Sequence, residues 1–117
     1  MHAGSFSQKA YQAIYYRGTT QNIIVKFILA DGYINASEIQ TTNRNTKWVS
    51  KFLPANDNAD NDGKMKFYHH STSGKKLSDY FILEDIQEYY QQVPAKIHGK
   101  YYVHTNTFSI TLSRYKH

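Results

Sequence analysis

The stretch from Asp31 to Ile39, DGYINASEI, places the tightest constraint on how this chain can fold. Asp31-Gly32 is typical of a tight turn, and the two apolar residues that come after it favour β-structure. Asn35 is a good helix N-cap, with Glu38 three residues later to complete a capping box. The stretch therefore predicts a strand that ends at a turn and passes directly into a helix.

Two short motifs resemble those of a DNA-binding family. Residues 32–37, GYINAS, resemble the GYINAT signature of the KilA-N domain, and residues 99–104, GKYYVH, are similar to its later G-x-Y-V-H element. KilA-N is a DNA-binding module of large DNA viruses and phages, and its fold is shared with the fungal APSES domain. The resemblance covers roughly residues 15–108. It implies a winged helix-turn-helix in a viral or phage protein that binds double-stranded DNA in the nucleus or cytoplasm of a host cell.

Length and charge agree with one basic domain. The 117 residues correspond to about one domain, and 40% of them are apolar, which is enough to bury a core. Fourteen Lys and Arg against nine Asp and Glu give a formal net charge of +5. Such a balance favours polyanionic partners through long-range attraction and counterion release.

Two absences exclude other classes of protein. The chain has no cysteine, so it forms no disulfide, thiolate zinc site or cysteine nucleophile, and an intracellular setting fits. No stretch approaches the roughly 20 apolar residues that span a bilayer, so we expect no membrane association. We expect a flexible N-terminal segment over residues 1–10 and a single domain over 11–117. A further domain in a longer protein and homo-oligomerisation stay open.

The ends of the domain favour β-structure. Residues 11–17 and 23–29 are rich in Tyr, Ile and Val and predict a β-hairpin around a break at 18–22. Residues 64–70 fit a short strand or an irregular segment. Residues 96–104 predict a two-stranded arm that bends at His98-Gly99. Residues 107–115 fit a strand and a short helix equally.

Three runs between these ends predict helices. The first starts at the Asn35 cap and ends near Thr42, and the second covers 46–53, where the apolar residues form an i, i+1, i+4, i+5 stripe. The third runs from Leu77 to Val93 and stops at Pro94. Residues 54–73 form a loop or insertion. The predicted fold class is therefore α+β: a small β-sheet or hairpin packed with a helix-turn-helix-like helix pair and a β-wing.

One spacing departs from the family pattern. Residues 74–80 are similar to the G-K-x-F-S-D-W segment of the family, which normally comes soon after the N-A-T helix. Residues 46–53 occupy that distance here. Both 46–53 and 75–82 qualify as the recognition helix, and we favour 46–53.

The candidate DNA contacts lie in these helices and in the arm. Cations near the second helix would reach phosphates, and amides beside them would reach base edges. The arm adds a basic tip with an aromatic residue. The predicted DNA-binding residues are Asn43, Arg44, Asn45, Lys47, Lys51, Lys75, Lys76, Lys96, His98, Lys100 and Tyr101.

Sites for catalysis or metals are not expected. Asn58, Asp60 and Asp62 mimic the start of a calcium loop, but His69 stands where the closing Glu belongs. The adjacent histidines His69 and His70 point to opposite faces of a strand, and no carboxylate pair has a spacing that recruits them. This argues against a metal-dependent nuclease. We expect a non-catalytic protein without a cofactor.

The tyrosines support a second interpretation. Exposed aromatic side chains on a sheet with cations nearby can stack single-stranded bases, which makes a single-stranded nucleic-acid or RNA binder an alternative. A protein-interaction module is another. We expect most of the eleven tyrosines to pack in the core, including Tyr15, Tyr33, Tyr80 and Tyr90.

Overall fold

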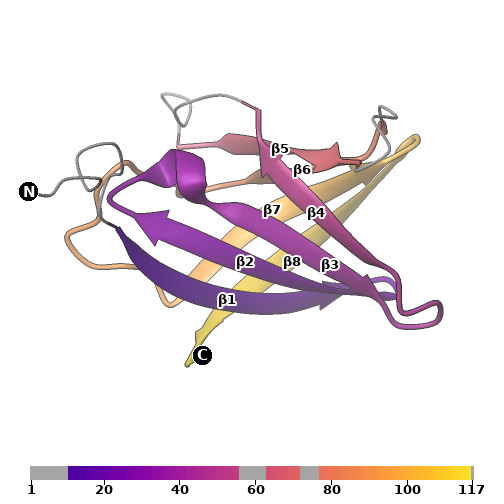
Figure 1. Cartoon of the computed structure of the whole chain (residues 1–117), viewed down its shortest axis with the longest axis horizontal. Helices are drawn as coiled ribbons and strands as arrows, with labels where there is room; N and C mark the ends of the chain where they lie inside the picture. Colours follow the sequence, from indigo (N-terminus) through magenta and orange to yellow (C-terminus); the bar gives the residue numbers. More distant parts are fainter. Residues whose placement is uncertain (1–10, 56–62, 72–76, 117) are drawn as a thin grey trace, which may run out of the picture.

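The protein is a closed β-barrel of eight strands in the computed structural model, which describes residues 11–55, 63–71 and 77–116 (Figure 1). One 3-10 turn, η2 (Ile34–Ala36), interrupts the strands. The strands are β1 (Gln12–Thr20), β2 (Ile23–Asp31), β3 (Glu38–Asn43), β4 (Val49–Pro54), β5 (Met65–His70), β6 (Tyr80–Leu83), β7 (Lys96–Val103) and β8 (Asn106–Tyr115).

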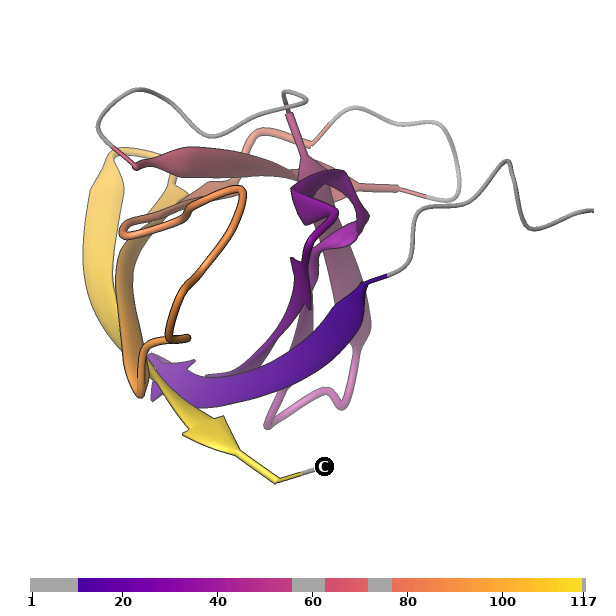
Figure 2. The same cartoon turned by 90° about the vertical axis from the view of Figure 1, so that its left-hand side faces the viewer.

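Each strand pairs antiparallel with the next one in sequence, and β8 returns to pair with β1. Seen end-on, the strands form a ring (Figure 2). Because the ring is closed, the sheet has no edge strand open along its whole length. Strands that lie four positions apart, such as β2 and β6, occupy opposite sides of the barrel.

The interior of the barrel is packed with side chains. Alternate residues of each strand point inward, as Val25, Phe27 and Leu29 do on β2. Inside, the Phe27 and Phe67 rings meet edge-to-face with centroids 5.6 Å apart, and the Phe52 and Phe81 rings do so at 4.8 Å. These aromatic contacts and the aliphatic residues around them form one hydrophobic core.

The α+β prediction is wrong, and so is the winged helix-turn-helix. The described residues contain no α-helix. Asn35 does not cap a helix: it lies within the 3-10 turn, which has no side-chain cap. Glu38 begins β3 and faces Ile28 across the β2–β3 ladder. The predicted turn is present, but the chain re-enters the sheet after it because β3 gains a full ladder of hydrogen bonds on β2.

The predicted helix at 46–53 is also wrong. Residues 49–54 form β4, in which only Phe52 is fully buried. Trp48 and Val49 are 77% and 70% exposed. The apolar stripe therefore does not mark one buried face, because in a strand successive residues point to opposite sides of the sheet.

The predicted helix at 77–93 is replaced by β6 and an irregular segment, residues 84–95. Three apolar residues of this run still face the core, since Ile86 is buried and Tyr90 and Val93 pack against it. The Tyr90 hydroxyl donates to the Asp85 carbonyl at 2.8 Å and accepts from the Gln87 N–H at 3.0 Å. Side-chain bonds thus satisfy backbone groups that a helix would have paired internally.

The β-hairpin expected at the start of the domain is confirmed, since residues 12–20 and 23–31 form β1 and β2. Residues 107–115, which the sequence leaves open between a strand and a short helix, belong to β8. The arm over 96–104 is extended but does not bend at Gly99, which lies in the middle of β7. Residues 1–10, 56–62, 72–76 and 117 lie outside the described residues. Within the predicted loop at 54–73, residues 65–70 form β5 instead.

Candidate functional site

Three tyrosines form a row on the outer surface of the barrel. Tyr68 on β5, Tyr80 on β6 and Tyr102 on β7 face one another in register across adjacent strands. The rings of Tyr80 and Tyr102 stack, with centroids 4.8 Å apart and an interplanar angle of 13°. The rings of Tyr68 and Tyr80 meet edge-on at 6.4 Å. Tyr68 is 50% exposed, and Tyr80 and Tyr102 are half-buried, so all three rings are accessible to solvent in part.

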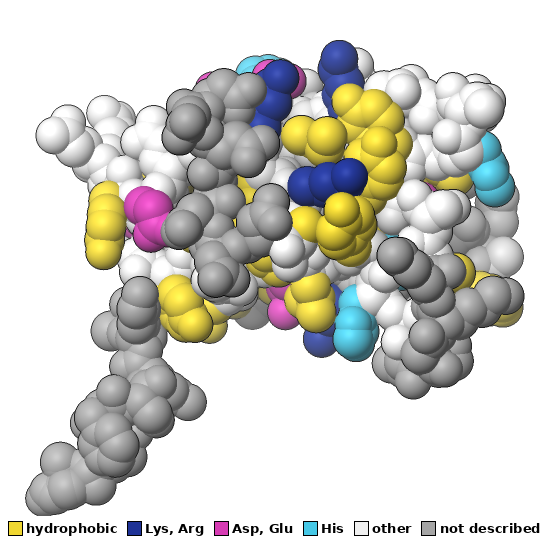
Figure 3. Space-filling view, turned by 90° about the horizontal axis from the view of Figure 1, so that it is seen from above, with side chains coloured by type: hydrophobic (Ala, Val, Ile, Leu, Met, Phe, Trp, Pro, Cys, Tyr) yellow, Lys and Arg dark blue, Asp and Glu magenta, His cyan; other side chains and the backbone are white. Residues whose placement is uncertain are grey.

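Lysines lie beside this row. The next register line holds Lys66 on β5, Ile82 on β6 and Lys100 on β7. The Lys66 ammonium nitrogen is 4.2 Å from the Tyr80 ring centroid and 4.9 Å from that of Tyr68, within the range of cation–π attraction. We call these two lines together, residues 66, 68, 80, 82, 100 and 102, the tyrosine–lysine face. Seen from this side, dark-blue Lys side chains sit among yellow hydrophobic ones over β5 and β6 (Figure 3).

The charge of the strands is asymmetric. Asp31 and Glu38 lie within β2 and β3, but the residues of β4 to β8 include no Asp or Glu. The charges within these five strands are therefore all positive, and the nearest carboxylates are Asp79 before β6 and Glu84 and Asp85 after it. The same five strands carry the cations Lys51, Lys66, Lys96, Lys100 and Arg114.

Strand β8 borders the tyrosine–lysine face with small hydroxyl side chains. Thr107, Ser109, Thr111 and Ser113 are all exposed and occupy successive outward positions. They face the outward residues of β7 in register, which are Tyr102, Lys100, His98 and Lys96. We call these four β8 residues the hydroxyl strip. Short hydroxyl side chains leave room above the sheet and offer both donors and acceptors to a ligand.

A hydrogen-bonded group of three side chains lies inside the barrel beneath this surface. The Asp79 carboxylate accepts from His69 Nδ1 at 2.7 Å and from the Tyr101 hydroxyl at 2.6 Å. The His69 ring stacks on Phe52 and the Tyr101 ring on Phe81. Burial raises the pKa of Tyr101, and its hydrogen bond to Asp79 adds to the rise. The group ties β5, β6 and β7 together where they carry the outer tyrosines.

A hollow of about 580 Å³ lies beside His69. It is bordered by residues of β4, β5 and the turn before β4, namely Trp48, Val49, Lys51, His69 and His70. His70 faces Lys51 across the β4–β5 ladder, one register line beyond Tyr68. The outer surface therefore continues from Tyr68 to a cation, an imidazole and an exposed tryptophan.

The comparisons with family models, with curated proteins and with solved structures each returned no match. They neither support nor exclude the resemblance to KilA-N. The fold that the resemblance implies is nevertheless not the fold observed, since its helix pair is replaced by strands.

The structure separates the predicted DNA-binding residues into two groups. Asn43 ends β3, and Arg44, Asn45 and Lys47 lie in the turn between β3 and β4. Lys96, His98 and Lys100 point outward from β7. Strands β3 and β7 are four positions apart in the ring, so the two groups do not share a face. Lys51 is exposed on β4 opposite His70, and Lys75 and Lys76 lie outside the described residues.

Two predicted contacts have structural roles instead. The Asn43 side-chain oxygen accepts from the backbone N–H groups of Asn45 and Thr46 at 2.9 and 3.0 Å, which holds the turn. Tyr101 points into the barrel, where its hydroxyl bonds to Asp79. Neither side chain is available as the DNA contact that the sequence predicts.

Sequence reasoning missed Lys66, Tyr68, Tyr80 and Tyr102 as site residues, and it assigned Tyr80 to the core. Sequence reasoning also missed the carboxylate of Asp79, which is hydrogen-bonded to His69. The two side chains come together only when β5 and β6 pair. The alternation Lys66, Tyr68, His70 along one strand face is a signal that could have been read. Among the described residues, no cluster of acidic residues, His or Cys could hold a metal ion, and no helix is long and apolar enough to cross a membrane.

Proposed function

We propose that this protein binds single-stranded nucleic acid across the tyrosine–lysine face and the hydroxyl strip. The observation that carries the proposal is the register row Tyr68, Tyr80 and Tyr102 beside Lys66 and Lys100, on strands without a carboxylate. Unpaired bases stack on aromatic side chains, and their phosphates pair with cations. One surface here offers both groups.

The ring contacts indicate which tyrosines would take bases. Strands β5 and β7 flank β6 on opposite sides, so Lys66 and Tyr102 cover opposite faces of the Tyr80 ring. Tyr80 thus supports the side chains of Lys66 and Tyr102 and does not itself stack a base. The face of Tyr68 that Lys66 does not cover, and the face of Tyr102 that points away from Tyr80, are left for bases. Each stacked base contributes about 1–3 kcal/mol.

The phosphates would run along β7 and the hydroxyl strip. Outward residues on one strand repeat every roughly 6.6–6.8 Å. Lys96, His98 and Lys100 therefore form a regular line of nitrogen groups, each opposite a Ser or Thr hydroxyl. An extended polyanion matches such a line better than a compact anion, because it meets several of these groups at once.

Duplex DNA, the partner expected from the sequence, stays a prediction with a different mechanism. A helix is not available to enter the major groove within the described residues. Duplex would have to bind through phosphates alone, which leaves the tyrosine rings unused. We also propose that the protein is not a catalyst and needs no cofactor. It would act inside the cell, where nucleic acids occur.

Fluorescence anisotropy tests the proposal. Labelled oligo-dT, oligo-U and a duplex of the same length are titrated with the full chain at about 50 mM and about 200 mM salt. We expect both single strands to bind more tightly than the duplex. With three lysines neutralising phosphates, log affinity should fall with log salt at a slope near −2. The ratio of oligo-dT to oligo-U affinity separates DNA from RNA. Preference for the duplex, or no binding, would contradict the proposal.

A further inference from the structure

A second hollow lies where the barrel closes. Strands β1 and β8 pair over only three positions, Tyr15 with Tyr115, Tyr16 with Arg114 and Arg17 with Ser113. The first residues of β1, Gln12 to Ile14, pair with β2 but not with β8. The two strands thus part at this end. A hollow of about 650 Å³ opens beside Gln12 and Ile14, within the size range of small-molecule sites.

The segment 84–95 forms the opposite wall. The Tyr16 hydroxyl donates to the Pro94 carbonyl at 2.7 Å. The backbone N–H of Arg114 donates to the Ala95 carbonyl at 2.9 Å. These bonds fix Val93 across the hollow from Ile14, which is buried. Val93 also packs against the core. The base of the hollow is therefore apolar and anchored from both sides.

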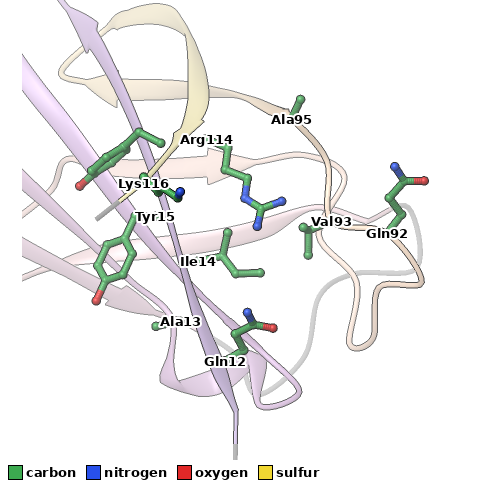
Figure 4. Close-up of a pocket in the computed structure, with 10 residues that line it drawn as sticks. Gln12, Ala13, Ile14, Tyr15, Gln92, Val93, Ala95, Arg114 and Lys116 are labelled. Carbon is green, nitrogen blue, oxygen red and sulfur yellow. The ribbon is translucent and has the colours of Figure 1, made fainter.

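The polar part of the hollow is cationic. Arg114 comes after the buried Ile110 and Leu112 on the inward side of β8, so its side chain reaches the mouth of the barrel. Its guanidinium extends toward Ile14 and Val93 (Figure 4). Lys116 also lines the hollow, and none of the lining residues is a carboxylate. Among the described residues, no Asp or Glu forms an ion pair with Arg114.

We propose that this hollow binds a small organic anion with an apolar body, its carboxylate or phosphate paired with Arg114. The planar guanidinium binds such oxyanions with two parallel hydrogen bonds. Ile14 and Val93 would bury the apolar part of the same molecule. The hollow is formed by β1, β8 and segment 84–95, so this site is separate from the tyrosine–lysine face on β5 to β7.

A pair of matched probes tests the charge requirement. Sodium octanoate and 1-octanol share the hydrocarbon chain and differ in charge. In ¹H–¹⁵N NMR titrations, octanoate should shift the amide signals of Ile14, Val93 and Ala95 in a saturable manner. Octanol should bind at least about tenfold more weakly than octanoate, because it lacks the charge-assisted hydrogen bond to Arg114. Equal binding of the two probes, or shifts confined to other strands, would overturn the proposal.

Two variants and a control locate the site. Arg114→Gln should weaken octanoate binding about tenfold, to the level of octanol. Val93→Trp should fill the hollow and abolish binding of both probes. Arg17→Gln changes an exposed arginine that does not line this hollow and should leave octanoate binding unchanged. Octanoate affinity that survives Arg114→Gln would refute the assignment, and unchanged oligo-dT binding by that variant would show that the two sites are independent.

Discussion

The His69 imidazole on β5 and the Asp79 carboxylate just before β6 are joined by a hydrogen bond of 2.7 Å. Both side chains are 17% exposed, and the same carboxylate accepts from Tyr101. We predict that Asp79→Ala lowers the free energy of unfolding by about 1–3 kcal/mol, because two largely buried donors lose their acceptor. Urea denaturation at neutral pH measures the loss. The double variant Asp79→Ala/Tyr101→Phe should lose less free energy of unfolding than the sum of the losses of the two single variants. Strict additivity would show that the carboxylate does not couple to the tyrosine.

The stacking assignment predicts unequal roles for the tyrosines. Tyr102→Ala and Tyr68→Ala should each weaken oligo-dT binding by about 1–3 kcal/mol. Tyr80→Phe should change it little, since it keeps the ring that supports Tyr102 and Lys66 and removes only the hydroxyl. Tyr89→Ala is the control, because Tyr89 is 74% exposed but lies in segment 84–95. Anisotropy titrations measure all four variants. Equal losses for Tyr89→Ala and Tyr102→Ala would mean that the row has no special part in binding.

Reversing a charge on β7 should act differently from reversing one on β2. Lys100→Glu should lower the affinity for oligo-dT and reduce the salt slope by about 0.7 or more, because at least one phosphate contact is lost. Lys26→Glu places the same change on β2, on the opposite side of the barrel from β6, and should have a much smaller effect. Titrations at several salt concentrations give both slopes. Identical slopes for the two variants would indicate attraction by net charge alone.

Gly99 is a packing requirement of the barrel and not the bend of an arm. A Cβ at this position would lie 2.6 Å from Leu83 Cδ2 and 2.7 Å from the Ile82 carbonyl oxygen. We predict that Gly99→Ala destabilises the protein by about 1–3 kcal/mol, since the oxygen belongs to the neighbouring strand and cannot move aside. Thermal unfolding followed by circular dichroism measures it. Thr111→Ala, an exposed change on β8, is the control, and an equal effect of the two changes would contradict the steric argument.

Stability should fall in alkaline solution. Burial raises the pKa of Tyr90 to about 12 from 10.0, and it also raises those of Tyr16 and Tyr101. Below pH 10 these phenols are protonated in both states, and their contribution is complete. Above that value the unfolded chain loses these protons first, so the free energy of unfolding decreases as pH rises from about 10 to about 12. Denaturation at several pH values tests this. Across the same pH range, the free energy of unfolding of Tyr101→Phe should fall less than that of the unchanged protein. A stability independent of pH across this window would refute it.

Local patterns predicted those elements that depend on neighbours close in sequence. The hairpin β1–β2 was predicted from two β-rich runs and a short polar break, because both strands and their turn lie within 20 residues or so of one another. The Asp31-Gly32 turn was also recognised, and Gly32 does take a positive φ of 102°. Strand β3, which comes after that turn, was not recognised, since it is held by its ladders to β2 and β4 and not by its own propensity.

The candidate site could be predicted only in part. Lys96, His98 and Lys100 were identified, and β7 does present all three outward. The tyrosine row was invisible because its members come from three strands whose register no single segment specifies. His69 and Asp79 stand ten residues apart, with a turn between them whose length the sequence does not reveal.

Composition and local pattern suffice to identify a basic, cysteine-free, tyrosine-rich chain with a β-hairpin at its start and an extended segment over residues 96–103. They leave the central half ambiguous, because short apolar runs such as 48–53 fit a helix and a strand equally well. Closure of the barrel decides between the two. Hydrogen bonds and buried aromatic rings contributed by other strands outweigh local propensity, and the pairings of β5 with β6 and of β6 with β7 bring the tyrosines and lysines onto one surface.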